Sequence, residues 1–358
     1  MKTATRIFYV FLGLVLLAAT YLGFWPVVVE PVAWSPPQAP PLAGEFAAND
    51  YLNQVERIAP GIGRGPEDVA RDGSGRLYTG LEDGRIIRMD TSGEDQELFA
   101  DTGGRPLGLD WDGSGNLIVA DAHKGLLSID PLGAITVLAT EEGGVPFAFT
   151  DDVAVAKDGV IYFTDASHKY TAPNYMEDLL EHAGNGRLLA YDPATKTCTA
   201  IMSDLRFANG VTLSSDESYL LMNETGRYRI WRYWLQGERK GESELIIENL
   251  PGFPDNLSTG QNGVYWVALA SPRDTTLDAL LPYPALRKVL YRLPRAFLPK
   301  PQPYGIALGI DGEGNVIHNM QTPTGAYAPI TSVNEYDGYL YLGSIESDAV
   351  GKVPVPHV

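Results

Sequence analysis

The chain has 358 residues, a formal net charge of −18 and a single cysteine, Cys198. One cysteine excludes an internal disulfide and a cysteine-rich metal site, and the negative charge disfavours nucleic acid as a partner. The residues that follow position 50 suffice to bury a large core, and their acidity is compatible with a hard cation at the centre of the domain.

The first predicted element is an apolar helix at the N-terminus. Lys2 and Arg6 precede a run without charges from Ile7 to Val29, which is long enough to cross a membrane as a helix. The two cations predict a cytoplasmic N-terminus, with the rest of the chain on the extracytoplasmic side, periplasmic or lumenal. A cleaved signal peptide is the alternative, although Ala18-Ala19-Thr20 is a poor cleavage site. We favour an uncleaved, single-pass transmembrane anchor over residues 1–30.

A proline-rich segment follows at residues 31–50. The pairs Pro36-Pro37 and Pro40-Pro41 favour an extended backbone, so the segment is predicted to form a stalk. We expect the anchor and the stalk to contribute nothing to the blades. A chain truncated before Gly44 would then remain soluble and folded.

One unit recurs from residue 51 to residue 358. A short β-like run ends in a turn, and a second apolar run follows at once, as in hairpins whose tight turns need positive φ. Six copies at intervals of a few tens of residues predict an all-β, six-bladed β-propeller. An irregular β-sandwich is the alternative, but it gives no reason for the repetition. The turns are Asp72-Gly73-Ser74-Gly75, Asp112-Gly113-Ser114-Gly115, Asp158-Gly159, Ser215-Asp216-Glu217-Ser218, Asn262-Gly263 and Asp337-Gly338.

The last blade needs a strand from the start of the domain. Only three strands are predicted after Pro329, so Gln54–Ile58 is expected to supply the fourth and leave no free sheet edge. The innermost strands of the six blades are predicted to begin near Glu67, Leu107, Asp151, Asn209, Asp255 and Ser332.

Two insertions interrupt the repeat, each between the second and third strands of a blade. Ser167–Asn185 contains a helical-looking stretch at Asn174–His182. Ser271–Gln302 is rich in Pro, Leu and Arg, with helix expected around Thr276–Leu281. Long ordered insertions on a rigid scaffold often form lids or binding loops, and passive decoration is the alternative.

Acidic and amide residues recur where the innermost strands are predicted to begin. These strands line the channel of a propeller, so equivalent positions in successive blades converge on its axis. Asp and Asn are poor strand residues, and buried carboxylates are costly unless a cation compensates them. Carboxylate and amide oxygens without His or Cys suit Ca²⁺. A turn residue is the alternative for any single position, but the shared register favours a metal. The residues are Glu67-Asp68, Asp151-Asp152, Asn209 and Asp255-Asn256.

The same regions resemble the strictosidine synthase-like family, including its membrane-anchored members, from about Gly65 to Val355. The wider superfamily contains gluconolactonases, senescence marker protein and paraoxonases, which are six-bladed propellers that hydrolyse lactones or esters at a central Ca²⁺. The motifs are Gly104-Arg105-Pro106-Leu107-Gly108-Leu109, Ala120-Asp121-Ala122, Phe149-Thr150-Asp151-Asp152-Val153, Tyr162-Phe163-Thr164-Asp165-Ala166-Ser167, Phe207-Ala208-Asn209-Gly210-Val211 and Leu250-Pro251-Gly252-Phe253-Pro254-Asp255-Asn256.

The resemblance implies a metal centre. Glu67, Asn209 and Asp255 match metal ligands of the superfamily. Asp151 stands where paraoxonases have an asparagine ligand, and Asn256 matches a further ligand of theirs.

The resemblance also has weaker parts. Asp68 and Asp152 resemble the acids around the second, buried calcium of paraoxonases. Leu107 stands about where a paraoxonase-type histidine is expected, so that histidine dyad is absent. Strictosidine synthase itself joins an amine to an aldehyde with a glutamate and no metal, and that glutamate has no clear counterpart here.

The sequence therefore predicts a calcium-dependent hydrolase, an arylesterase or lactonase, that acts on a small-molecule ester or lactone. Ca²⁺ would bind the substrate carbonyl oxygen, and Asp151 would be the catalytic base that activates water. Two alternatives remain open. One is a non-catalytic propeller that binds a partner through its channel face and insertions, and the other is condensation of an amine with an aldehyde.

Overall fold

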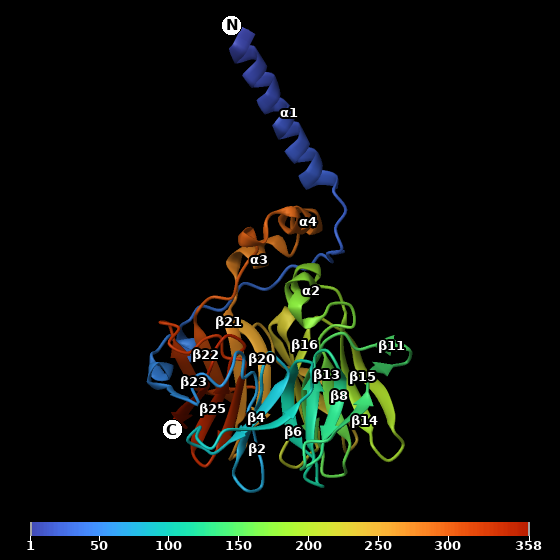
Figure 1. The fold of residues 1–358 in the computed structure, drawn as a ribbon, viewed down its shortest axis with the longest axis vertical. Helices are drawn as coiled ribbons and strands as arrows, with labels where there is room; N and C mark the ends of the chain where they lie inside the picture. Colours follow the sequence, from blue (N-terminus) through green and yellow to red (C-terminus); the bar gives the residue numbers. More distant parts are fainter. Residues whose placement is uncertain (1, 357–358) are drawn as a thin grey trace.

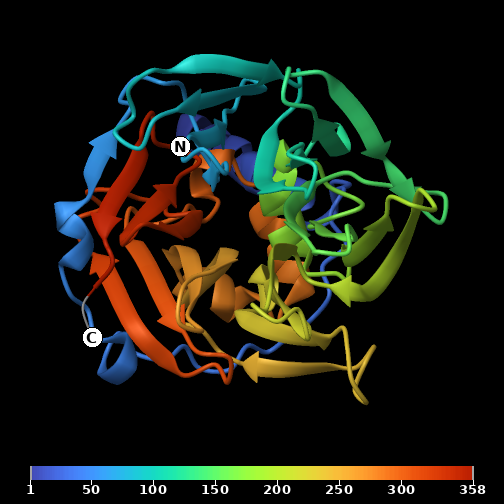
Figure 2. The same cartoon turned by 90° about the horizontal axis from the view of Figure 1, so that it is seen from below.

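The computed structural model describes residues 2–356 and contains a six-bladed β-propeller from which one long helix projects (Figure 1). Six four-stranded sheets are arranged around a common axis, as the view from below shows (Figure 2). Within each sheet the strands are antiparallel neighbours. The predicted all-β propeller is therefore confirmed.

The strands of the first three blades follow the chain from the axis outward. Blade one contains β2 (Ala70–Arg71), β3 (Leu77–Gly80), β4 (Arg85–Met89) and β5 (Glu97–Asp101). Blade two contains β6 (Pro106–Trp111), β7 (Leu117–Asp121), β8 (Gly125–Ile129) and β9 (Ile135–Ala139). The short pair β10 (Glu141–Glu142) and β11 (Val145–Pro146) precedes blade three, which contains β12 (Thr150–Val155), β13 (Ile161–Asp165), β14 (Gly186–Asp192) and β15 (Thr197–Leu205).

The remaining blades follow the same order. Blade four contains β16 (Ala208–Leu213), β17 (Tyr219–Glu224), β18 (Arg229–Trp234) and β19 (Ser243–Ile247). Blade five contains β20 (Gly252–Thr259), β21 (Tyr265–Pro272), β22 (Gly305–Ile310) and β23 (Val316–Thr322). Blade six contains β24 (Ser332–Tyr336), β25 (Tyr339–Gly343), β26 (Val350–Pro354) and β1 (Glu56–Ile58).

Blade six closes the ring with strands from both ends of the domain. β1 pairs with β26 in an antiparallel register that places Glu56 opposite Lys352 and Ile58 opposite Val350. This confirms the predicted closure, because β1 is the outermost strand of blade six and covers the edge of β26.

The apolar core is divided among the contacts between neighbouring blades. Second strands are covered on both faces, and every residue of β7, Leu117–Asp121, is buried. A strand covered on both faces reads as a continuous apolar run rather than an alternating one. One cluster joins Ile118 of blade two to Phe163 and Leu189 of blade three.

The alternating strand directions give the propeller two distinct ends. We call the end at which innermost strands begin and second strands end the upper face. Both insertions emerge there, one as α2 (Tyr175–Glu181) after β13 and the other as α3 (Thr275–Leu280) and α4 (Pro284–Arg292) after β21 (Figure 1). Their places in blades three and five are as predicted. The sequence did not predict α4, because Pro282 and Pro284 suggest a loop, whereas Pro284 in fact starts the helix.

The N-terminal helix α1 (Lys2–Phe24) projects away from the upper face (Figure 1). The most apolar 18-residue window of its segment Thr3–Phe24 has a mean hydropathy of 2.2, and none of that window is buried in the protein. By length and composition, this helix is able to span a membrane.

The segment after α1 departs from the expected free stalk. We call residues 26–43 the strap, because they run across the upper face from α1 to the far side of the propeller (Figure 1). The backbone N–H of Val32 donates to Glu181 O at 2.8 Å, and that of Trp34 donates to Leu281 O at 3.1 Å. The Trp34 ring stacks on His182 with 4.6 Å between ring centroids.

A buried arginine joins the strap to both insertions. The Arg287 side chain is fully buried and donates to Leu180 O at 2.7 Å, to Leu281 O at 2.9 Å and to Val32 O at 2.5 Å. Phe46 is also buried in the apolar cluster between blades four and five, so the expectation that residues 31–50 contribute nothing to the blades is wrong. Proline-rich composition predicts an extended backbone correctly, but it does not reveal what the extended chain packs against.

Candidate functional site

The predicted site begins at a backbone irregularity shared by four blades. The innermost strand of each has a register shift against its second strand, and the shifts fall at Leu107-Gly108, Asp151-Asp152, Asn209-Gly210 and Asp255-Asn256. Such β-bulges free residues from the ladder and redirect their side chains. The bulges explain why residues unsuited to strands stand at these positions.

Close packing around the axis accounts for the glycines in two of the bulges. A Cβ on Gly108 would lie 2.3 Å from Asp152 Oδ1, and one on Gly210 would lie 2.6 Å from the Asn256 Cα. The innermost strands of adjacent blades therefore approach one another too closely for side chains there. The residue that precedes each glycine is left to face the upper end.

Five of the predicted residues form what we call the upper cluster: Glu67, Asp151, Asn209, Asp255 and Asn256. Asn256 Nδ2 donates to Glu67 Oε1 at 2.9 Å. Asn209 hydrogen-bonds the Asp255 carboxylate. Asp151 lies near enough to Asp255 and to Glu67 for the charges to repel one another. The structure thus brings together side chains from blades one, three, four and five.

The upper cluster is rich in buried oxygens that lack donors. Glu67, Asp151, Asn209 and Asn256 are between 2% and 4% exposed, and Asp255 is half-buried. Within the described residues, Glu67 Oε2, Asp151 Oδ2, Asn209 Oδ1 and Asn256 Oδ1 have no hydrogen-bond partner. Buried polar atoms are normally satisfied, so these bare oxygens are positions at which a cation or ordered water would bind.

The charges of the upper cluster are poorly compensated. Burial, followed by repulsion from Asp255 and other acids, raises the pKa of Glu67 and of Asp151 well above the usual carboxyl values. Burial raises the pKa of Asp255 to about 7. Removal from water and like charges both disfavour the ionised form of a carboxyl group.

Two residues at this site were not predicted from the sequence. Arg105 is buried, donates to Gly65 O at 2.9 Å, and is the cation whose charge opposes the raised pKa of Glu67 and Asp151. Tyr175 of α2 is close enough to Asp255 for that carboxylate to raise its phenol pKa, although burial is the larger cause. Arg105 lies within a quoted motif, but only the fold shows that it faces the acids.

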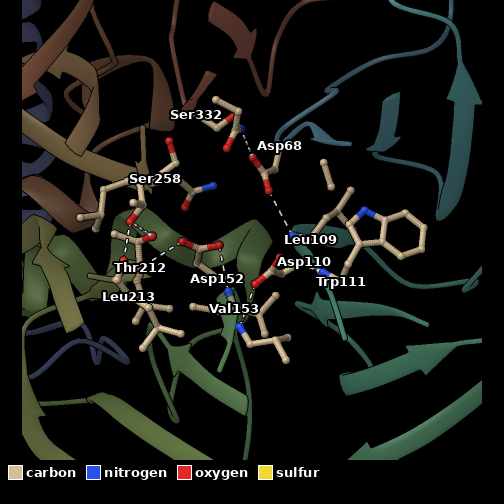
Figure 3. A pocket seen from close by; sticks show the side chains of 18 of the residues that line it. Asp68, Leu109, Asp110, Trp111, Asp152, Val153, Thr212, Leu213, Ser258 and Ser332 are labelled. Atoms are coloured by element: carbon tan, nitrogen blue, oxygen red, sulfur yellow. Dashed lines mark hydrogen bonds between the residues drawn. The ribbon is translucent and has the colours of Figure 1, made fainter. Parts of the chain in front are cut away.

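A second group of acids lies below the first, in a cavity of about 470 Å³ lined by the innermost strands (Figure 3). Each carboxylate accepts a backbone N–H from the next blade: Asp68 from Leu109 at 3.1 Å, Asp110 from Val155 at 2.7 Å, and Asp152 from Val211 at 2.8 Å. These bonds tie blades one to four together. Burial raises the pKa of Asp110 to about 6 and that of Asp152 well above its usual value.

The second group of acids, Asp68, Asp110 and Asp152, differs from the upper cluster in that its carboxylate oxygens have hydrogen-bond donors. Asp68 also accepts from Asn334 Nδ2 at 2.8 Å, and Asp152 also accepts from Val153 N at 2.8 Å. Their oxygens already have donors, so the structure gives them a role without a cation. A second calcium at Asp68 and Asp152 stays a prediction, and Asp110 is a member of this group that the sequence did not single out.

The donor set of the upper cluster fits a hard cation. In residues 2–356 no three His, Cys, Asp or Glu side chains stand close enough together to hold a metal by themselves. Two of the five groups in the cluster are amides, however, and the carboxylates repel one another as they stand. Ca²⁺ accepts carboxylate and amide oxygens in loose geometry, which matches this mixture.

Two family models match the chain: strictosidine synthase over residues 151–238, and the N-terminal part of strictosidine synthase-like proteins over residues 44–89. Strictosidine synthase-like protein 6 of Arabidopsis thaliana is 39% identical over 313 residues, which are 86% of this chain and 82% of that protein. Adipocyte plasma membrane-associated protein of Homo sapiens is 34% identical over 360 residues, or 93% of this chain and 85% of that protein.

Solved structures with the same fold include a gluconolactonase of Xanthomonas campestris. It superposes with a TM-score of 0.62 and 16% identity, and the match covers 92% of this chain and 98% of that one. Regucalcin of Agrobacterium tumefaciens, a calcium-binding protein, superposes with a TM-score of 0.57 and 14% identity over 83% of this chain and 90% of its own. At these identities the likeness shows the propeller fold alone.

Proposed function

The chain belongs to the strictosidine synthase-like family, and we propose that it is a calcium-dependent hydrolase of carboxylic esters or lactones. The observation that carries the proposal is the upper cluster. Four buried oxygens from separate blades lack donors among residues 2–356, and three carboxylates repel one another, which is an arrangement that a bound cation would stabilise. Lactonase-type neighbours of the same fold support this class of reaction.

The proposed calcium ligands are Glu67, Asn209 and Asp255, with Asn256 and Asp151 beside them. When bound, Ca²⁺ would polarise the substrate carbonyl and stabilise the negative charge that develops on its oxygen. Asn256 is oriented by its bond to Glu67 Oε1, which leaves the amide oxygen facing away from that carboxylate. Asn209 is held in the same way by Asp255.

Asp151 is the proposed general base. Its Oδ2 is buried and has no donor among the described residues, so it is free to accept a proton from a water molecule. The pKa of Asp151 is raised by burial and by neighbouring acids, which makes the carboxylate a stronger base than an exposed aspartate. The water oxygen would then add to the carbonyl carbon of the ester or lactone. As the tetrahedral adduct collapses, the acyl C–O bond would break, and the leaving alcohol oxygen would take up the proton held by Asp151.

The experiment is a panel of aryl esters and lactones, assayed with the full chain in detergent before and after chelation. We expect turnover that chelation abolishes and that Ca²⁺ restores. Turnover unaffected by chelation would contradict the calcium-dependent mechanism. Absence of hydrolysis on the whole panel would favour the partner-binding propeller. Metal-independent condensation of an amine with an aldehyde, observed in a separate assay, would favour the strictosidine synthase-type reaction.

The proposed location is a membrane, with the propeller on the extracytoplasmic side. The relatives named as plasma membrane-associated and the apolar helix α1 support membrane association. The orientation follows from Lys2 and Arg6, which precede the span. A reporter that is active only outside the cytoplasm, fused at Val358, is expected to be active. Activity from a cytoplasm-only reporter at the same position would contradict the orientation.

A further inference from the structure

The insertion of blade five carries an apolar surface that no described residue covers. Tyr283, Leu286 and Phe297 are 57%, 49% and 67% exposed, and we call them the interfacial patch. Other residues of α4 are packed, because Arg287 is fully buried and Leu290 joins the cluster around Leu180, Leu277 and Leu281. The segment around α4 is thus held in place by packed residues and still leaves large apolar side chains open.

The same segment concentrates positive charge in an acidic protein. Residues 281–300 contain no Asp or Glu, although the chain as a whole has a net charge of −18. Cations interspersed with exposed apolar side chains are the pattern of segments that lie in the interface of anionic membranes. The cations are Arg287, Lys288, Arg292, Arg295 and Lys300.

The insertion is fixed to the end of α1. Arg292 donates from Nε to Trp25 O and from Nη1 to Leu22 O, both at 2.7 Å, so the guanidinium caps the last carbonyls of the helix. Tyr21 returns a bond from its hydroxyl to Arg292 O at 3.1 Å. Figure 1 shows α4 between the end of α1 and the propeller. The interfacial patch therefore lies at the level where the apolar span ends.

We propose that residues 283–300 dock onto the surface of the membrane that α1 spans, with the interfacial patch inserted among the lipids and with Lys288 and Lys300 paired with anionic headgroups. The occupant is a lipid surface rather than a second protein, because the span ends beside the patch and holds it at that surface permanently. Docking directs the upper face, and with it the upper cluster, toward the bilayer. The inference rests on α1 entering a membrane and is independent of the proposed hydrolysis.

The test places one fluorescent probe at a time on the full chain in nanodiscs that contain a single copy. The background carries Cys198→Ser, which removes the only native cysteine. Probes are attached at Phe297→Cys, at Leu14→Cys within α1, and at Leu132→Cys. Leu132 is the matched control, because it is 93% exposed and lies in the turn between β8 and β9 at the lower face. Lipids spin-labelled near the headgroup test the probes at 297 and 132. Lipids spin-labelled near the end of the acyl chains test the probe at 14, because Leu14 lies in the middle of α1.

We expect quenching of the probes at positions 297 and 14, and none of the probe at 132. A probe at 297 that behaves like the one at 132, while the probe at 14 is quenched, would overturn the inference. A probe at 14 that is not quenched would remove its premise and overturn it also, without bearing on calcium or ester turnover. Single-copy discs ensure that contact with a second copy produces no signal.

The charge requirement has its own pair of variants. Lys288→Glu with Lys300→Glu is expected to reduce quenching at 297 in discs with anionic lipid. The control, Lys196→Glu with Lys240→Glu, makes the same change of charge in exposed turns of the lower face and is expected to leave quenching unchanged. Full quenching in the first variant would overturn the preference for anionic lipid.

Discussion

Asp151 differs from the other members of the upper cluster in what its side chain is able to do. Glu67 and Asp255 are each hydrogen-bonded by an amide of the cluster, whereas no amide of the cluster is shown to bond Asp151; Asp151 Oδ2, like Glu67 Oε2, has no donor among the described residues. A carboxylate at this position can both contact a cation and accept a proton. An amide there would only be able to contact the cation. The catalytic proposal therefore depends on the titratable group rather than on the oxygen alone.

The variant Asp151→Asn separates these two roles. It keeps a carbonyl oxygen in place but removes the base, so we expect calcium binding to persist while the rate of ester or lactone hydrolysis falls by about 10²–10⁴-fold. Steady-state kinetics and calorimetric titration with Ca²⁺ measure the two effects. Asp50→Asn, at an exposed position remote from the axis, is the control. An unchanged rate in Asp151→Asn would rule out the base assignment.

Site residues can be predicted from the sequence where their type is unusual for the expected strand. Site residues whose type is ordinary for their local context are missed. Asp and Asn at the start of a strand are conspicuous, which is why Asp151 and Asp255 were found. Asp110 lies within the strand-like run before a predicted turn, and Arg105 precedes a proline, so neither stands out in one dimension. Their neighbours come from other blades, and only the folded ring brings them together.

Among the elements, the strap connects parts that the chain separates widely. It joins α2 of blade three to α3 of blade five through backbone bonds and through Arg287. The turns and strands repeat and are therefore predictable from the sequence. The strap occurs once and has no periodic pattern, so the sequence indicates its conformation but not its place.

Two truncations test the role of the strap. Removal of residues 1–25 keeps it, and removal of residues 1–43 deletes it together with the Trp34 ring that stacks on His182. In the shorter chain we expect faster amide exchange in α2 and α3 and a lower melting temperature, because buried contacts of both helices are lost. Hydrogen-exchange mass spectrometry compares the two chains. Equal protection of α2 and α3 in both would contradict the assigned role.

For the whole molecule, the buried acids around the axis make stability depend on pH and on calcium. Burial raises the folded-state pKa of Asp255 to about 7 and of Asp110 to about 6, and those of Glu67 and Asp151 also rise. In the unfolded chain such groups titrate near pH ~4. The folded chain therefore binds more protons than the unfolded chain between these values, so its stability decreases as the pH rises.

Thermal unfolding of the chelated protein should show this slope. The stabilisation by protonated acids is complete below about pH 4 and is lost as the pH rises through about 7, so the melting temperature should fall across that range. Added Ca²⁺ should restore more stability near pH 8 than near pH 5, since it replaces the missing protons. Asp255→Asn should flatten the slope. A melting temperature of the chelated protein that stays constant or rises from about pH 4 to 7 would contradict the assignment.

Calcium binding by the full chain is the most direct test of the proposed metal site. Calorimetric titration of the chelated full chain should show uptake of Ca²⁺, because the buried oxygens of the upper cluster lack donors. The variant Asp255→Ala should lose that uptake, since it removes a carboxylate ligand and leaves the remaining acids to repel one another. Asp50→Ala, an exposed aspartate, should retain it. No uptake by the unmutated chain, or undiminished uptake by Asp255→Ala, would rule out a calcium site at the upper cluster.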